Sequence, residues 1–182
     1  MPFIRILAAV AIGLAALSAA AQTYPSRPVR VIIPFPPGGT LDTLGRALTH
    51  RLSEQTGQPF VVENKPGGNG IIGADLVAKA QADGYTLLFN ASTFVTAPMT
   101  MKSTPYSVTR DFAPIALVAK APLSVAINKN LPITDLKSLQ AYAKSNPGNL
   151  TFAVGSIGSA GHLATELLKR SAGIDYMVVA YK

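Results

Sequence analysis

The sequence repeats one unit, a short apolar segment followed by a glycine-rich turn and an amphipathic segment, and this repetition restricts the fold more than any other feature. The first copy combines the apolar run Val29–Phe35, the turn Pro36–Gly39 and leucines at helical spacing in Leu41–Thr56, with Gly57 as the helix end. Apolar strands that alternate with helices are typical of parallel sheets covered on both faces. The sequence therefore predicts an α/β fold.

A second copy of the unit follows directly along the chain. We expect a strand at Phe60–Glu63, a turn at Pro66–Gly70 and a helix at Ile71–Ala80, and then a third strand at Tyr85–Phe89. These segments predict one lobe with a mainly parallel sheet flanked by helices.

The character of the sequence changes after Asn90, where Pro98 and Pro105 interrupt a polar stretch. We expect a boundary within Thr100–Tyr106, with a first lobe at 22–103 and an incomplete second lobe at 104–182. The expected elements of the second lobe are strands at Ala113–Ala119 and Leu123–Asn128, a helix at Asp135–Lys144 capped by Thr134, a strand at Leu150–Val154, the loop Gly155–Ser159, a helix at Ala160–Ala172 and a strand at Tyr176–Ala180.

The N-terminus has the features of a secretory signal peptide at 1–21. Arg5 precedes the apolar run Ile6–Leu17, and small residues close it, so that cleavage is expected after Ala21, with Ala20 as the alternative. The run is shorter than the roughly 20 residues that span a bilayer, which disfavours a membrane anchor. Without a cysteine to carry a lipid, the mature chain is expected in a periplasm, with full secretion as the alternative.

Composition excludes several classes of function. The absence of cysteine removes disulfide scaffolds, thiolate metal sites and cysteine nucleophiles. The formal net charge is +7, or +6 once Arg5 is removed with the signal peptide, which favours anionic partners. Because the Lys and Arg residues are scattered singly and aromatic content is only 7%, we do not expect nucleic-acid binding. Small anionic solutes remain the consistent partners.

A series of ordered motifs covers the whole mature chain. It comprises Tyr24-Pro25-Ser26-Arg27-Pro28, Val31-Ile32-Ile33-Pro34-Phe35-Pro36-Pro37-Gly38-Gly39 with Asp42, Val62-Glu63-Asn64-Lys65-Pro66-Gly67, Ile72-Gly73-Ala74, Asp83-Gly84-Tyr85-Thr86-Leu87-Leu88, Arg110-Asp111-Phe112-Ala113-Pro114, Asn146-Pro147-Gly148, Gly158-Ser159, His162-Leu163 and Tyr181-Lys182. In this order the motifs resemble the Bug family, the substrate-binding components of tripartite tricarboxylate transporters.

The resemblance implies a two-lobed fold of the type II periplasmic binding proteins that closes around a di- or tricarboxylate. It implies presentation of this ligand to a membrane permease with large and small subunits, a monomeric full-length protein, and neither catalysis nor a cofactor. Chains of the family run further than Lys182, so a C-terminally shortened chain is expected. The particular carboxylate is not indicated by the sequence.

The residues themselves favour carboxylate binding in the loop after the first strand. Exposed N–H groups at a helix N-terminus bind anions, and Gly38 and Gly39 allow the backbone to approach a ligand. Thr40 is expected to cap the following helix, and Asp42 to brace the loop, since its charge would repel a carboxylate. Phe35 is either part of the core or an apolar wall of the site.

Two further loops complete the predicted site. In the second lobe, Ser156, Gly158 and Ser159 precede a helix in the same arrangement, and His162 in its first turn either contacts the ligand or stabilises the loop. In the first lobe, the polar residues at the carboxyl end of the third strand are Asn90, Ser92 and Thr93. The competing interpretation is that all of these are ordinary loops of an α/β fold. Neither His162 nor His50 belongs to a metal-binding cluster.

The main alternative is a nucleotide-binding enzyme of the Rossmann type. Gly68-Asn69-Gly70-Ile71-Ile72-Gly73 fits the dinucleotide fingerprint between a strand and a helix. However, Lys65–Gly67 separates the strand from the first glycine of the motif, and the following strand ends at Asn90, where an acidic ribose ligand would be expected. An exported protein is also an uncommon place for such a cofactor.

Overall fold

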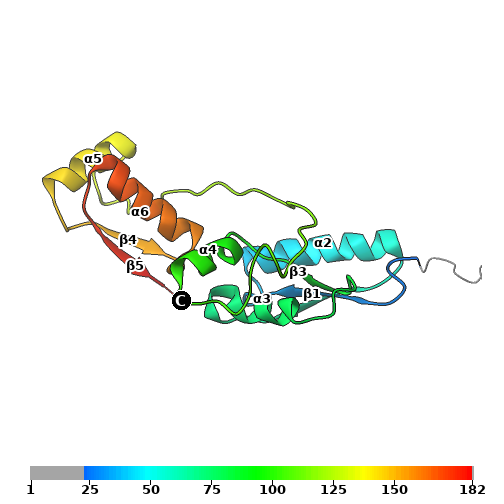
Figure 1. Ribbon diagram of the computed structural model, residues 1–182. Coiled ribbons are helices and arrows are strands. Elements are labelled where there is room, and N and C mark those ends of the chain that lie inside the picture. Colours follow the sequence, from blue (N-terminus) through cyan, green and yellow to red (C-terminus); the bar gives the residue numbers. More distant parts are fainter. Residues whose placement is uncertain (1–22, 182) are drawn as a thin grey trace, which may run out of the picture.

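The structure is a computed structural model that describes residues 23–181. The expected signal peptide, with both possible cleavage points, falls outside these residues. Figure 1 shows an elongated molecule in which a larger group of elements is followed by a smaller one. We call them the first and second lobes. None of the helices between residues 23 and 181 is long and apolar enough to cross a membrane.

A parallel three-stranded sheet forms the centre of the first lobe. Its order is β2 (Phe60–Asn64), β1 (Val29–Ile33) and β3 (Thr86–Leu88). Val31 of the central strand pairs with Val62 on one side and Leu87 on the other. Apart from the exposed Arg30, the residues of the central strand are buried on both faces, which explains why its sequence is a nearly continuous apolar run rather than an alternating one.

Helices cover both faces of this sheet, as the alternation in the sequence predicts. Figure 1 shows α2 (Thr40–Thr56) and α3 (Ile71–Ala78) on opposite sides of β1. Gly57 ends α2 in a left-handed conformation with φ 71°, as expected of a C-terminal glycine. The short 3-10 turn η1 (Gly68–Gly70) precedes α3 directly.

The second lobe is a smaller αβ layer. Its parallel strands β4 (Thr151–Val154) and β5 (Met177–Ala180) are flanked by α5 (Leu136–Ser145) and α6 (Ala160–Ala172). The core of this lobe consists of buried side chains from these elements and their loops, namely Ile133, Leu139, Ala143, Leu150, Ile174 and Tyr176. The expected bounds of α6 are confirmed, and those of β5 differ by one residue.

Three sequence expectations about elements are wrong. Thr134 does not cap α5, because Asp135 occupies that position and accepts a hydrogen bond from the Ser138 N–H at 2.7 Å. The expected polar loop after Asn90 contains a two-turn helix, α4 (Thr93–Thr100), which tolerates Pro98 in its last turn. The expected strands Ala113–Ala119 and Leu123–Asn128 are extended chain without strand partners.

The helix α4 is held to the chain that follows it by aromatic packing. Phe94 stacks on Tyr106 with ring centroids 5.5 Å apart, and Phe112 packs edge-on against both rings. The Tyr106 hydroxyl also donates to the Phe94 carbonyl at 3.1 Å. These contacts attach residues 106–112 to the first lobe. The division of the chain at 103/104 stays a prediction.

Candidate ligand-binding site at the lobe junction

Two of the predicted site loops meet at one edge of the first sheet. The strands β1 and β3 are parallel neighbours, so their carboxyl ends lie side by side. The loop before α2 therefore lies next to Asn90 and Ser92, which follow β3. This edge is where open α/β sheets bind ligands. The topology brings together residues that are about fifty positions apart in the sequence.

The first loop presents exposed glycines at the start of α2. Gly38 has a φ of +84°, which an L-residue with a side chain rarely adopts, and Gly39 precedes the helix in an extended conformation. Gly39 occupies the N-terminal cap position and makes no side-chain cap bond. The expectation that Thr40 caps this helix is wrong, since Thr40 is the first residue inside it.

Asp42 holds this loop in place through hydrogen bonds of its side chain. Its buried carboxylate accepts hydrogen bonds at 2.9 Å from the Gly38 N–H, the Arg46 guanidinium and the Asn64 amide. The hydrogen bond from Arg46 is the largest cause that holds the pKa of Asp42 well below its usual range, followed by those from Gly38 and Asn64. These protein partners occupy both carboxylate oxygens and fix the position of the glycine loop.

The start of α4 contains buried polar atoms without a partner. The Thr93 hydroxyl and the Asn90 Nδ2 are both inaccessible to solvent and make no hydrogen bond with residues 23–181. Asn90 uses only its Oδ1, which accepts from the Ala91 N–H at 2.7 Å. Ser92 is exposed at the cap position and makes no cap bond. A buried polar group without a hydrogen-bond partner destabilises a fold, so these two side chains are candidates to form hydrogen bonds with a ligand.

The second-lobe loop is preorganised by its own hydrogen bonds. Ser159 caps α6 by accepting from the His162 N–H at 3.2 Å, and His162 Nδ1 accepts from the Gly158 N–H at 3.2 Å. The half-buried imidazole therefore stabilises the loop, one of the two roles expected for it. The Gly158 N–H is occupied by this bond and the Ser159 N–H donates to the Ser156 carbonyl at 3.2 Å, so the free donors at this helix start lie in its first turn.

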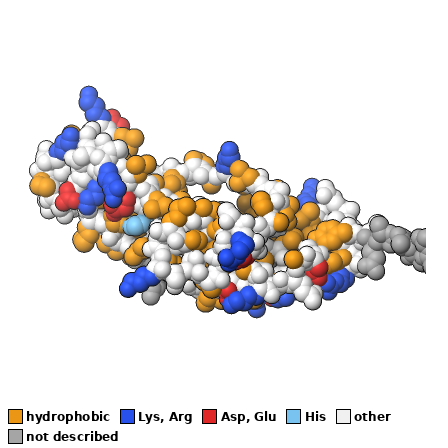
Figure 2. All heavy atoms as spheres, in the orientation of Figure 1, with side chains coloured by type: hydrophobic (Ala, Val, Ile, Leu, Met, Phe, Trp, Pro, Cys, Tyr) orange, Lys and Arg blue, Asp and Glu red, His pale blue; other side chains and the backbone are white. Residues whose placement is uncertain are grey.

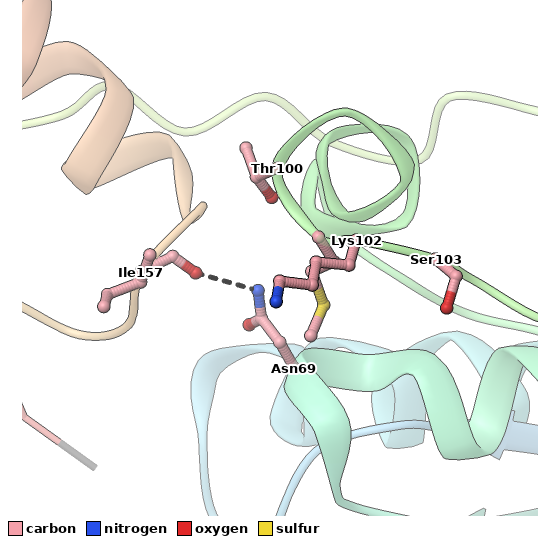
Figure 3. Close-up of a pocket in the computed structure, with 6 residues that line it drawn as sticks. Asn69, Thr100, Lys102, Ser103 and Ile157 are labelled. Carbon is pink, nitrogen blue, oxygen red and sulfur yellow. Dashed lines mark hydrogen bonds between the residues drawn. The ribbon is translucent and has the colours of Figure 1, made fainter.

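Contacts between the lobes involve two residues that sequence reasoning did not identify. The Asn69 amide of η1 donates to the Ile157 carbonyl at 3.1 Å (Figure 3). The Asn69 Oδ1 accepts from the Ser156 hydroxyl at 3.1 Å. Thr96 of α4 donates to the Gly158 carbonyl at 2.7 Å. The sequence offered one hint for Asn69, its position between glycines in a tight turn, where its φ is +56°.

Gly158 permits this close approach between the lobes. It has a φ of +80°, and a Cβ built on it would lie 2.6 Å from the Thr100 hydroxyl. Any larger residue would therefore be strained in its backbone and would also push the loop away from α4. The glycine in this loop is required for the contact with the first lobe.

A pocket of about 510 Å³ opens beside these contacts. Figure 3 shows its lining at the end of α4 and at the tip of the second-lobe loop. The lining residues are Asn69, Thr100, Met101, Lys102, Ser103 and Ile157. None of the twelve predicted site residues belongs to this lining. The predicted residues surround the starts of α2, α4 and α6 instead, and Phe35 places its ring against Gly70.

The charged side chains on this part of the molecule are paired or widely spaced. Arg46 of α2 is paired with Asp42 at 2.9 Å. Figure 2 shows Lys and Arg side chains scattered singly over the visible face, with hydrophobic side chains gathered over its middle. Within residues 23–181 no three His, Cys, Asp or Glu side chains come together in a way that would bind a metal.

The chain matches the model of the tripartite tricarboxylate transporter family receptor over residues 44–182, and it belongs to this family. Among curated relatives, protein BugT of Bordetella pertussis is 40% identical over 191 residues, which cover 100% of this chain and 58% of BugT. The resemblance to the Bug family is thereby confirmed. The chain spans about half the length of the curated relatives it matches.

Solved structures show the same fold. An R. palustris protein with adipate has a TM-score of 0.80 and 39% identity, and a periplasmic transporter has a TM-score of 0.71 and 37% identity. MatC from Rhodopseudomonas palustris, with bound malate, has a TM-score of 0.69 and 31% identity. The matches cover 87% of this chain and 53–54% of each structure. The expected periplasmic-binding-protein-like α/β fold is confirmed, and the nucleotide-enzyme alternative is not favoured.

Proposed function

We propose that this chain forms the ligand-binding part of a periplasmic solute-binding protein that captures a small dicarboxylate for a tripartite transporter. The observation that carries this proposal is the buried, unpartnered pair of polar atoms on Asn90 and Thr93, beside the exposed glycines that begin α2. An amide donor, a hydroxyl and free backbone N–H groups together form a site for a carboxylate.

The binding mechanism relies on preorganised donors rather than on a neighbouring cation. The N-termini of α2 and α6 carry partial positive charge and free N–H groups, whereas at α4 the Phe94 and Val95 N–H groups donate to the Ala91 and Ser92 carbonyls, and its side chains supply the donors instead. Asp42 and His162 fix the loops before α2 and α6, so little conformational entropy is lost when a carboxylate binds. We assign no catalytic residue and no cofactor to this site, in keeping with a family of receptors.

The ligand class follows from the two relatives described with adipate and malate, which are both dicarboxylates. A dicarboxylate of this size fits a site between two lobes, one acid group on the first-lobe loops and the other toward the second-lobe loop. We further propose a periplasmic location, large and small permease subunits as partners, and a monomeric full-length form.

Isothermal titration of a full-length form tests this function. We define the chimera as this chain joined to the part of BugT that lies outside the matched region. Malate, succinate and adipate should bind, and the corresponding diamides should bind at least about 100-fold more weakly, since each diamide loses at least two charge-assisted bonds and each costs roughly 1.5–3 kcal/mol. Equal affinity for acids and diamides would refute the carboxylate assignment.

NADH is the control ligand for this titration. The glycine motif at 68–73 is the feature that resembles a dinucleotide site, but Asn69 in its centre is engaged with the second lobe. We therefore expect no saturable change in NADH fluorescence when the chimera is added. Saturable binding would favour the enzyme alternative instead.

A further inference from the structure

Asn64, the last residue of β2, makes hydrogen bonds in three directions with its half-buried side chain. Its Nδ2 donates to the Phe35 carbonyl at 3.0 Å and to the Asp42 Oδ1 at 2.9 Å. Its Oδ1 accepts from the Arg46 guanidinium at 2.9 Å. One side chain of β2 therefore joins the loop after β1 to the first turns of α2, the two elements between which the exposed glycines lie.

The hydrogen bond to Phe35 continues the contact between β1 and β2 beyond the backbone ladder. The last ladder bond runs from the Lys65 N–H to the Ile33 carbonyl at 2.9 Å, where both strands end. Two residues further along, the Asn64 side chain supplies the donor to the Phe35 carbonyl. The chain that leads to Gly38 is therefore still attached to β2 after it has left the sheet.

Only a short side-chain amide satisfies all three partners of Asn64. The Phe35 carbonyl and the Asp42 carboxylate can only accept hydrogen bonds, whereas the Arg46 guanidinium can only donate them. Position 64 therefore needs two N–H donors and one acceptor in the same group. A carboxylate at this position would offer no donor and would stand against the negative charge of Asp42.

The glycine loop depends on Asn64 through Asp42. One Asp42 oxygen accepts from Asn64, and the other accepts from the Gly38 N–H and from Arg46, each at 2.9 Å. Because Arg46 also donates to Asn64, the three side chains form a closed ring of hydrogen bonds. Rotation of any one of them would break two of these bonds, so the ring holds Asp42 in the orientation that binds Gly38.

We propose that Asn64 is a positioning residue for ligand binding, which sets through this ring the direction of the exposed N–H groups of the glycine loop. The inference rests on the proposed function, in which these groups receive a carboxylate. Both N–H groups of the Asn64 amide and its oxygen are engaged within the protein, so Asn64 acts on the ligand through the loop. Its replacement weakens binding without removing a ligand contact.

Titration of the chimera with malate measures this role. Asn64→Asp and Asn64→Ala should each weaken malate binding at least about 10-fold, because the loop is no longer held in one geometry before the ligand arrives. Asn64→Ala adds no charge and serves where the new carboxylate prevents folding. Asn149→Asp, exposed in the second lobe, is the control and should bind malate as the unchanged chimera does. Unchanged affinity of the Asn64 variants would overturn the proposal.

A double variant tests whether the ring itself is responsible. Asp42→Asn combined with Asn64→Asp reverses donor and acceptor between the two positions, keeps the net charge and restores the hydrogen bond between them. It should therefore bind malate within about 3-fold of the unchanged chimera, although each single change weakens binding. A double variant that binds no better than Asn64→Asp alone would contradict the proposal.

Hydrogen exchange of the ligand-free chimera separates a loosened loop from a destabilised lobe. In Asn64→Ala the amides of 38–40 should exchange at least about 10-fold faster, while those of 29–33 in β1 keep their rates. Equal acceleration of both segments would mean that Asn64 only stabilises the lobe, and the proposal would be wrong. This measurement needs no ligand, so it decides the role of Asn64 separately from a failure of malate to bind, which would refute the proposed function instead.

Discussion

Asp42 shows how a single residue can fix the position of a glycine-rich loop. Its carboxylate joins the Gly38 N–H, Arg46 and Asn64, which belong to the loop, to α2 and to β2. A ligand carboxylate would be repelled by a free aspartate, but here both oxygens are directed into the protein. The loop therefore keeps its exposed N–H groups while the negative charge stays beneath it.

The lowered pKa of Asp42 predicts the acid sensitivity of the first lobe. A carboxyl whose folded pKa lies below its unfolded value of about 3.9 stabilises the fold above that value and loses this contribution as pH falls toward the folded pKa. Asp42→Asn should therefore lower the melting temperature at pH 7, with a difference that shrinks below about pH 4. Glu54→Gln, exposed on the same helix, is the control and should behave like the unchanged chain.

Substitution by alanine should change stability differently at Gly38 and at Gly39. A Cβ would meet no atom within 4 Å at Gly38 and only the Pro36 carbonyl at 3.8 Å at Gly39, so the two differ in backbone conformation rather than in space. Gly38→Ala should cost about 1–2 kcal/mol in thermal unfolding because of its positive φ, and Gly39→Ala close to none. Gly39→Val should abolish malate binding by the chimera without lowering its melting temperature. Equal stability of both alanine variants would contradict this account.

Removal of the Thr93 hydroxyl should have opposite effects on the stability of the protein and on its affinity for ligand. Its buried hydroxyl has no hydrogen-bond partner among residues 23–181, so Thr93→Val, which has nearly the same shape, should raise the free energy of unfolding by about 1 kcal/mol. The same variant should bind malate at least about 10-fold more weakly, whereas Thr93→Ser should retain affinity. Calorimetric melting and titration of the chimera would measure both. Unchanged affinity in the valine variant would exclude Thr93 from the site.

At the scale of elements, the second-lobe loop is held between its own helix and the first lobe. Ser159 and His162 order it from α6, while Asn69 of η1 and Thr96 of α4 bond its carbonyls and hydroxyl from the other side. The contacts of Asn69 and Thr96 fix the position of this loop relative to the first lobe. The starts of α4 and α6 are thereby kept near each other.

Substitution of Asn69 measures how strongly the contact between the lobes depends on η1. Asn69→Gly keeps the positive φ accessible while it removes both cross-lobe side-chain bonds, each worth about 0.5–1.5 kcal/mol. Amides of 155–159 should then exchange hydrogen roughly 10-fold faster in the chimera. Thr104→Ala, outside the contact between the lobes, is the control. Identical exchange in both variants would mean that other contacts hold the lobes together.

Many large apolar side chains of residues 23–181 are exposed. The two-stranded sheet, the extended segment 113–126 and side chains such as Met99 and Ile157 are all in contact with solvent. We expect the chain 22–182 alone to bind a hydrophobic dye and to melt in a broad, weakly cooperative transition. The chimera should bind less dye and melt sharply. A sharp transition of the chain alone would contradict this expectation.

The sequence by itself determined the features that depend on near neighbours in the chain. The apolar run of β1, the glycine that ends α2 and the helix 160–172 follow from local patterns, because helix formation and turns depend on residues a few positions apart. The same patterns placed Gly38, Gly39, Ser159 and His162 at helix starts. The family resemblance rests on those motifs.

Only the tertiary structure decided which of these features meet. Asn69 and Thr96 bond a loop almost ninety and about sixty positions away, and no periodicity encodes such a contact. The residues at 113–126 have the composition of strands and yet form none, because a strand exists only when another backbone supplies its hydrogen bonds. Local propensity is a property of the segment, whereas pairing is a property of what surrounds it.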